Sequence, residues 1–578
     1  MKRLSLIKEK LTRYDLKGAA FKLLISWLMV SAFYTANSSL PFTSPDFFIE
    51  IKLSVFITAV AVIWLLLCRI SDRKFISVLM IVSATVYGIL GAVGYTDFSF
   101  SVGCCAAVGL IIYFTDLSDI RLHLHSSVKW IVAGTLMLFF TLFVGIICCL
   151  YYQNHWTPCF DFGLFAQMFH NMKETGLPLI TCERDRLLSH FAVHFSPVFY
   201  LLLPAYALLP DPRTLLIMQA LVVVSGVIPL VLICRRHSLS QPTVCAFAVI
   251  YTLYPCFAGG CFYYLHENNF LAPLILWLIY FCERGKPLPK LVFLLLLLTV
   301  KEDAAVYAAV ISLYFLFTDK NYKCNLSMLS ISVIYFLTVT YFLARFGDGV
   351  MTGRYDNYIY DGSGSLITVI LAVIKDPVYV ISQCFTRAKL IFILQMLLPL
   401  GFLPFITREP RRLILAIPFL LINLMTDYQY QFNISFQYCF GSGAMLIYMS
   451  AVNFSELRRP KLLLNALCCS LIIAFGLYWH RLDYFDAYRD ATEQRESVSR
   501  ALALIPDDAS VAASTFFVAE LSQRAELYEL ERTSHQTEYY VLDLRYDNDA
   551  YSVYDFFTDE FETVFFEREA VGVFRRIK

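Results

Sequence analysis

Long apolar runs, broken by short polar segments, extend along most of the chain before residue 480. A transmembrane helix needs about twenty predominantly apolar residues, and the runs predict about fifteen such helices, several of them short. They are expected near 19–37, 50–69, 76–95, 99–115, 129–151, 213–234, 241–259, 268–282, 288–301, 303–318, 325–345, 388–407, 411–426, 438–454 and 461–479. The pattern therefore predicts an all-α polytopic membrane protein.

Lysine and arginine are concentrated in the short segments between alternate apolar runs. Cytoplasmic loops are enriched in these residues, and alternation from a cytoplasmic N-terminus puts every basic segment on one side. The basic segments are MKRLSLIKEK, CRISDRK, IRLHLHSSVK, CRRHS, CERGKPLPK, TDKNYK, TREPRR and ELRRPK. This alternation requires that the segment HFSPVFYLLLPAYALLPDPRT does not cross the membrane. Its apolar part is short and interrupted by Pro204, which predicts a re-entrant or interfacial segment.

The remaining polar segments then share the extracytoplasmic side. They are 152–196, 260–267, the neighbourhood of 301–303, 346–387, 427–437 and 480–578. The last of these, the tail, is rich in Asp, Glu and Arg and has no run long enough to span. ASVAAS and EYYVLDL predict strands, FFVAELSQRA predicts a helix, and ETVFFEREAVGVFRRIK predicts a closing hairpin. The tail is expected to be a small soluble α/β domain outside the membrane.

Composition agrees with a membrane protein. The chain is 58% hydrophobic and 16% charged, with a mean hydropathy of +0.61, which excludes an ordinary soluble domain. A net charge of +1 provides no basic field for nucleic acid. Most of the 17 cysteines lie in apolar runs, but Cys159 and Cys182 flank one polar loop and could pair on an oxidising side. No cleavable signal peptide is evident, so a multi-pass protein of the cell membrane is expected.

Asp161, in CFDFGLFAQ, follows one predicted span and precedes an amphipathic run. A carboxylate there could act as a general base or hold a metal in a hydrated cavity. It could equally cap the following helix. His190 and His194 stand four residues apart, so on a helix they would share a face. Zinc binding lacks a third ligand nearby, and the other interpretations are that His194 caps or orients the following segment or that it lines a cavity.

Two further polar clusters lie between apolar runs. His266 and Glu267 occupy a short turn flanked by aromatic residues, which would enclose the imidazole at headgroup depth. Lys301, Glu302 and Asp303 interrupt a hydrophobic stretch, and a charge at mid-bilayer costs about 2.5–3.5 kcal/mol. They could form a self-neutralising hairpin turn, or a phosphate-binding lysine beside carboxylates that position it or bind a cation.

The loop 344–365 contains Arg354, Tyr355 and several glycines on the same predicted side. This composition suits a flexible aromatic lid as well as a simple connector. The segment DYQYQFNISFQY, residues 427–438, offers rings and amides that suit a sugar or a headgroup.

Taken together, these motifs resemble a known family. FDFGLFAQMFHN, LHENNFLAP, KEDAAVYAAVISLYF and the HFSPVFYLLLPAYALLPDPRT segment look like the bacterial membrane-protein family called domain of unknown function 2079. The tail motifs IPDDASVAAS, ELSQRAELYEL and YYVLDLR resemble that family's extracytoplasmic end. The resemblance covers residues 129–578 and leaves 1–128 as an additional N-terminal block of four helices. One departure is that the family usually has Asp-Phe-His where this chain has Tyr264-Leu265-His266.

That family is in turn similar to C-type glycosyltransferases, which use polyprenyl-phosphate sugars. The resemblance implies a GT-C-like transmembrane core at 129–479, with outer loops 152–196 and 346–387, followed by the soluble domain 480–578. It implies that Asp161 is the base that activates an acceptor hydroxyl, and that Lys301 and Arg354 stabilise the departing phosphate. The other residues expected to bind substrate are His194, His266, Glu267, Glu302, Asp303 and Tyr355.

The leading hypothesis is therefore an inverting transfer from a polyprenyl-phosphate sugar donor to an envelope glycan, lipid or protein acceptor. The alternatives are a transporter or flippase for lipid-linked glycans, and a non-catalytic envelope assembly protein that uses the tail for binding. No internal repeat is visible, and the charges are expected outside the membrane, which disfavours a transporter. Many members of the resembling class bind a divalent cation, but no metal-ligand set is evident in this sequence.

Overall fold

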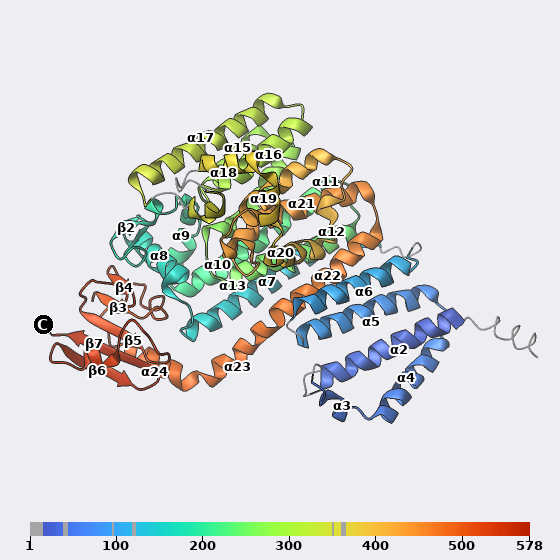
Figure 1. Cartoon of the computed structure of the whole chain (residues 1–578), viewed down its shortest axis with the longest axis horizontal. Helices are drawn as coiled ribbons and strands as arrows, with labels where there is room; N and C mark the ends of the chain where they lie inside the picture. Colours follow the sequence, from blue (N-terminus) through green and yellow to red (C-terminus); the bar gives the residue numbers. More distant parts are fainter. Residues whose placement is uncertain are drawn as a thin grey trace, which may run out of the picture.

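The computed structural model describes residues 16–38, 44–94, 97–117, 123–348, 352–359 and 366–577. Most of these residues are helical, and a small sheet lies at the C-terminal end of the chain (Figure 1). The fold class predicted from the sequence is confirmed: the protein is an all-α polytopic membrane protein with a small C-terminal α/β domain. The basic start MKRLSLIKEK lies outside the described residues.

Four helices of 16 to 22 residues lie in the N-terminal region. They are α2 (Leu16–Asn37), α4 (Leu53–Cys68), α5 (Arg73–Gly94) and α6 (Phe98–Phe114), with the short α3 (Phe47–Glu50) between the first two. This block lies to one side of the remaining helices (Figure 1). It packs on α22 (Pro460–Tyr478), whose buried Cys469 and Ile472 belong to the same apolar core as Met80 and Val108. The block is thus an addition to the main bundle rather than part of its centre.

The main bundle consists of short and broken helices around one large apolar core. Its helices before residue 300 are α7 (Val128–Gln153), α10 (Pro212–Ser225), α11 (Val227–Arg236), α12 (Gln241–Thr252), α13 (Pro255–Phe262), α14 (Leu271–Glu283) and α15 (Pro287–Leu298). Those after it are α16 (Ala304–Thr318), α17 (Tyr322–Phe346), α18 (Leu366–Lys375), α19 (Pro377–Cys384), α20 (Arg387–Leu397), α21 (Phe440–Leu457) and α22. Many of them begin at proline, which has no N–H to satisfy and is favoured at the first helical position.

The predicted count of about fifteen spans is not confirmed. Among the described residues, seven helices are long and apolar enough to cross a membrane, or eight if the bent pair α18 and α19 is one span. The difference arises where apolar runs form short helices or irregular turns inside the bundle. The run predicted at 411–426 forms a 3-10 turn, Pro410–Ala416, followed by a π turn, Phe419–Leu424. Helix α21, which is buried along most of its length, shows that an apolar run can serve the protein core instead of the lipid.

The segment HFSPVFYLLLPAYALLPDPRT, which is predicted not to cross the membrane, forms no continuous helix. It forms a 3-10 turn, Pro197–Leu201, and then the six-residue α9, Leu203–Leu208. A helix of this length spans about 9 Å, far less than the hydrocarbon core of about 30 Å. Leu208 is 82% exposed at its end, as expected for a segment that lies in the interface.

The polar loop after α7 is compact and ordered. It contains a π turn, Cys159–Gly163, then α8 (Leu164–Thr175) and a two-residue antiparallel ladder between β1 (Leu179–Ile180) and β2 (Leu188–Ser189). Helix α8 ends at Gly176, whose positive φ of 76° gives the left-handed C-cap that glycine favours. We call the end of the bundle that bears this loop the loop face.

The tail joins α22 through α23 (Asp483–Asp490) and α24 (Thr492–Leu502) and carries a five-stranded mixed sheet. The sheet order is β4 (Leu527–Glu529), β3 (Val511–Ala513), β5 (Tyr539–Asp543), β7 (Val571–Arg576) and β6 (Phe561–Glu567). Strand β3 pairs in parallel with β4 and β5, whereas β7 pairs antiparallel with β5 and β6. The two predicted strands and the closing hairpin are therefore confirmed.

The helix predicted from FFVAELSQRA is wrong. Residues 515–521 form turns, and Phe517, Val518 and Ala519 are all buried. A Cβ added at Gly163 in the loop would lie 3.0 Å from Val518, so this stretch is packed tightly on the loop. Tertiary packing on both sides has overridden a local helical pattern.

The tail and the loop share one apolar core. Cys159, Leu164 and Cys182 from the loop pack with Val511, Val541 and other core residues of the tail. Both cysteines are free thiols, buried in this shared core. Hydrogen bonds reinforce the contact, because Thr181 exchanges two with the backbone of Leu527. The tail is consequently docked on the loop face and does not hang from it as a separate module.

Candidate functional site

Asp161 lies at the loop face, in the turn that follows α7. Its Oδ2 is 3.2 Å from Nε2 of His266, and its side chain remains 28% exposed. The hydroxyl of Tyr263 also hydrogen-bonds to it. Burial alone would raise the pKa of Asp161, but the charge and hydrogen bond of His266 and the Tyr263 hydroxyl together lower it. The carboxylate is thus ionised, oriented and accessible, the state that a general base requires.

The alternative role of Asp161 as a helix cap is wrong. Helix α8 begins at Leu164, its N-cap position is Gly163, and no side chain caps it. Asp161 lies two residues before that cap position. Its contacts go instead to His266 and Tyr263, which come from the chain after α13.

The turn after α13 aims His266 at Asp161. Tyr264 has a left-handed backbone, with φ of 71°, a conformation that is uncommon for a residue with a large side chain. His266 then donates its backbone N–H to Oδ1 of Asn269 at 2.6 Å, and its ring stacks on Tyr263. Asp and Asn are the side chains that tolerate a positive φ best. Position 264 therefore has a backbone conformation that an Asp would also adopt readily.

Behind His266, Glu267 and Lys301 form a buried ion pair. Lys301 Nζ lies 2.7 Å from Glu267 Oε1, and the two side chains are only 5% and 3% exposed. Burial opposes both charges, but Lys301 and the neighbouring histidines hold the pKa of Glu267 well below its usual range. Glu267, Glu302 and Asp303 in turn raise the pKa of Lys301 despite its burial. Both groups are therefore charged, and two of the three Nζ hydrogens remain for other partners.

His194 joins the cluster through Glu302. Its Nδ1 lies 3.0 Å from Glu302 Oε1. Burial and the nearby Lys301 lower the pKa of His194, although Glu302 opposes this. Burial raises the pKa of Glu302, but the hydrogen bond and charge of His194, together with the charge of Lys301, outweigh it, and the net shift is downward. His190 faces Glu183 at 3.0 Å instead, so the two histidines do not converge on one zinc ion.

Asp303, Arg354 and Tyr355 occupy the far side of the cluster. Burial, helped by Glu302, raises the pKa of Asp303 to about 6, while Lys301 and Arg354 oppose the rise. The Arg354 guanidinium lies over two rings, 5.2 Å from the centre of Tyr428 and 4.9 Å from that of Tyr438. Tyr355 donates its hydroxyl to the backbone oxygen of Leu421. Residues 349–351 and 360–365 of the expected lid lie outside the described residues.

Several oxygen atoms in the cluster have no partner among the residues that the structure describes. They are Oε2 of Glu267, Oδ1 of Asn268, Oε2 of Glu302 and Oδ1 of Asp303, all buried. A buried polar atom without a partner costs about 1–3 kcal/mol, so a cluster of them is typical of a site that receives a ligand or ordered water. In the described part of the chain, no three His, Cys, Asp or Glu side chains converge as ligands for a metal ion.

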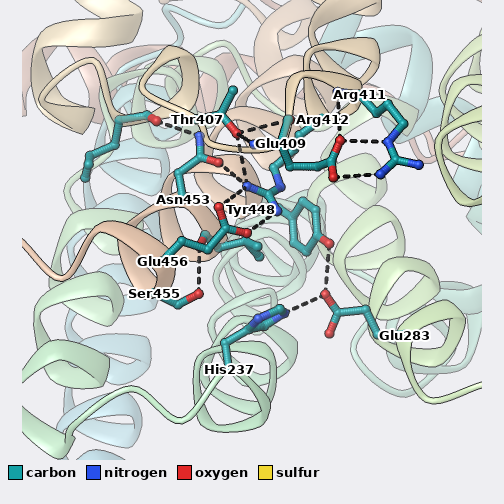
Figure 2. Close-up of polar contacts among 12 residues, drawn as sticks. His237, Glu283, Thr407, Glu409, Arg411, Arg412, Tyr448, Asn453, Ser455 and Glu456 are labelled. Carbon is teal, nitrogen blue, oxygen red and sulfur yellow. Dashed lines mark hydrogen bonds and ion pairs between the residues drawn. The ribbon is translucent and has the colours of Figure 1, made fainter. Parts of the chain in front are cut away.

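Figure 2 shows a second polar network. His237 and the Tyr448 hydroxyl both contact Oε1 of Glu283 at 2.8 Å, and Arg412 pairs with Glu456 at 2.6 Å. Glu283 ends α14, whereas Glu267 precedes its start, so the 13-residue helix separates the two clusters by about 20 Å. Glu283 and Glu456 each have cationic or hydroxyl partners here, which suits a network that holds helix ends together.

The structure thus brings all the predicted site residues to one face: Asp161, His194, His266, Glu267, Lys301, Glu302, Asp303, Arg354 and Tyr355. Sequence reasoning did not single out Tyr263 or Glu183. The only signal for Tyr263 was its place in the aromatic stretch before His266. Glu183 carried no signal, because its pairing with His190 depends on the β1–β2 turn.

The fold and this cluster define a polytopic α-helical membrane protein with a charged, partly buried site at one end of its bundle. The chain belongs to the family described as "Predicted membrane protein (DUF2079)", which matches residues 153–553. A crystal structure of ArnT from Cupriavidus metallidurans bound to undecaprenyl phosphate is similar at 13% identity and a TM-score of 0.46. The similarity covers 78% of this chain and 98% of the ArnT chain. Among curated proteins, none matches the chain.

Proposed function

We propose that the protein is a membrane glycosyltransferase that moves a sugar from a polyprenyl-phosphate donor to a cell-envelope acceptor at the loop face. The observation that carries the proposal is the geometry around Asp161. An ionised carboxylate, 28% exposed, is held by His266 and Tyr263 next to a charged cluster that contains two cations, Lys301 and Arg354. An oriented base beside cations is what displacement of a phosphate by a hydroxyl group needs.

In the proposed reaction, Asp161 accepts the proton of the acceptor hydroxyl. The hydroxyl oxygen forms a bond to the anomeric carbon from the side opposite the leaving group, which inverts that carbon. The bond from this carbon to the phosphate oxygen breaks, and its electron pair leaves with the phosphate. Lys301 and Arg354 stabilise the charge that develops on the phosphate oxygens.

The remaining residues position these groups. Glu267 fixes the Lys301 ammonium by their 2.7 Å contact, and His266 fixes the Asp161 carboxylate. Glu302 holds His194 at the wall of the pocket. The loop face is then the extracytoplasmic side, as the distribution of basic segments favours, with the N-terminus in the cytoplasm and the tail outside.

The test is the Asp161→Asn variant, compared with Asp490→Asn on the exposed face of α23. Each purified variant is reconstituted with a radiolabelled polyprenyl-phosphate sugar and envelope extract, and transfer of the label is measured. Loss of a general base lowers rates by about 10²–10⁴-fold, so Asp161→Asn should lose at least 100-fold and Asp490→Asn nothing. Full transfer by a folded Asp161→Asn protein would remove the base assignment.

The two alternatives predict different results in the same membranes. A flippase would move the labelled lipid across the bilayer without releasing its phosphate, and Asp161→Asn would leave that movement intact. An assembly protein that binds through its tail would keep lipid-sugar binding after deletion of 480–578. Because loop and tail share one core, the deletion would also expose Leu164 and Cys182, so folding of the truncated protein is checked in the same experiment.

A further inference from the structure

A groove of about 290 Å³ opens at the loop face beside Asp161. Its walls come from the end of α7, the turn after α13, the segment before α21 and the junction of α22 with α23. The side chains that matter are Tyr151, Phe262, Tyr263, Phe436, Arg481 and Tyr484. Asp161, Lys301 and Arg354 are not among the residues that line this groove, and Tyr263 is the wall residue that contacts Asp161.

Arg481 is the cation of this groove. Its guanidinium lies 5.1 Å from the ring centre of Phe262 and 5.6 Å from that of Tyr484, and it donates to the Tyr484 hydroxyl. In the part of the chain that the structure describes, Arg481 makes no ion pair with a carboxylate. By contrast, Arg489 on the next helix pairs with Asp486. The Arg481 charge is thus held in place by aromatic rings and is available to an anion.

The groove lies at the depth of lipid headgroups. Phe475, Trp479 and Phe485, which flank Arg481 along α22 and α23, are 38%, 46% and 46% exposed. Exposed aromatic rings at the end of a spanning helix are typical of the boundary between lipid tails and water. An anion that reaches Arg481 from the bilayer is therefore the phosphate of a lipid in the adjoining leaflet.

One side chain connects the groove with the candidate base. Tyr263 lines the groove, hydrogen-bonds to Asp161 and stacks on His266 with ring centres 5.5 Å apart. On its other side, Tyr263 contacts Phe436, with ring centres 4.3 Å apart. Asp161 itself is 28% exposed, so a hydroxyl group of a ligand that extends past Tyr263 can reach its carboxylate.

We propose that this groove receives the acceptor, and that the acceptor is a lipid-borne polyol phosphate whose phosphate binds Arg481 and whose hydroxyl faces Asp161. The aromatic walls pack on the apolar face of the polyol, and Arg481 fixes the position of the polyol in the groove by a bidentate contact with the phosphate. This inference rests on the proposed function for the transfer step. In that step the hydroxyl proton goes to Asp161, and the new bond joins the hydroxyl oxygen to the anomeric carbon of the donor sugar.

Equilibrium binding to the full-length protein in detergent tests the inference independently of transfer. The probes are radiolabelled phosphatidylglycerol (a lipid with a phosphate and free hydroxyls), phosphatidylcholine, undecaprenyl phosphate and free glycerol phosphate. The variant Arg481→Gln should weaken phosphatidylglycerol binding at least tenfold and leave undecaprenyl phosphate binding unchanged. The matched control Arg489→Gln should change neither.

Any other outcome contradicts the assignment of this groove as the acceptor site. Equal affinity for phosphatidylglycerol and phosphatidylcholine removes the polyol phosphate, and free glycerol phosphate binding as tightly as the lipid removes the lipid-borne source. A loss of undecaprenyl phosphate binding in Arg481→Gln makes the groove the donor site. If Arg481→Gln does not fold, Ser435→Trp, which fills the groove, should give the same selective loss.

These binding measurements can fail independently of the transfer assay that tests the proposed function. Asp161→Asn should abolish transfer while it retains phosphatidylglycerol binding. If Asp161→Asn keeps full transfer but Arg481→Gln still loses phosphatidylglycerol, the base assignment fails and the groove assignment stands. If Asp161→Asn abolishes transfer and Arg481→Gln binds phosphatidylglycerol normally, the base assignment stands and the groove assignment fails.

Discussion

Replacing Lys301 with methionine removes the cation at the centre of the site and leaves a buried carboxylate without its partner. Two unit charges 2.7 Å apart attract by about 6 kcal/mol at an effective dielectric constant of ~20, before desolvation is subtracted. Breaking such a pair by removing one partner costs about 3–5 kcal/mol. We therefore expect Lys301→Met to lower the free energy of unfolding by about 3–5 kcal/mol.

The charged neighbours of the pair make the loss of stability different for the two single variants, Lys301→Met and Glu267→Gln. Without Lys301, Glu267 keeps only His194 and His266 as favourable neighbours, and Asp303 repels it. Without the Glu267 charge, Lys301 retains Glu302 and Asp303, which both raise its pKa. Glu267→Gln should therefore destabilise the protein less than Lys301→Met. The double variant should recover part of the loss, because neither charge is then buried alone.

The assay is unfolding of the purified variants in mixed micelles, with Lys301→Met, Glu267→Gln and the double variant measured side by side. Arg489→Met serves as control, because its pair with Asp486 has a similar length of 2.9 Å but its side chains are 73% and 69% exposed. Exposed pairs contribute about 0–1 kcal/mol. If Lys301→Met costs no more than Arg489→Met, the pair is not the buried anchor that the structure describes.

Three further perturbations test other parts of the structure. Asp303→Asn should raise the unfolding temperature at pH 8 and leave it nearly unchanged at pH 4. The fold raises the pKa of Asp303 to about 6, so its stabilising contribution is present below pH 4 and lost as the pH rises through 6; the difference is at most about 3 kcal/mol. Gly259→Ala should prevent folding or lower the unfolding temperature sharply, since its Cβ would overlap the backbone oxygen of Ile434, whereas Gly134→Ala, with open space around it, should be tolerated. Thr181→Val should loosen the tail by about 1–3 kcal/mol, because the buried Leu527 backbone loses its partner, and faster proteolysis between 480 and 578 would report it; an unchanged cleavage rate would contradict the docking.

Local sequence signals singled out the candidate site residues but not their pairings. Charged and polar residues between apolar runs stand out, because the membrane penalises them wherever they have no function or partner. Asp161, His266 and Lys301 were recognisable in this way. The choice of partner, His266 for Asp161 and Glu267 for Lys301, depends on which helix ends meet at the loop face. Nothing in the spacing along the chain encodes that choice, since 105 residues separate Asp161 from His266.

The sequence by itself determined the membrane class, because the length of apolar runs acts locally on insertion. Only the tertiary structure decided which apolar runs form long helices. The run at 411–426 became turns inside the bundle, since a segment covered by other helices need not match the bilayer thickness. It also decided that FFVAELSQRA is not a helix and that Tyr263 touches Asp161. Packing energy depends on what a surface meets, and only the folded chain determines that.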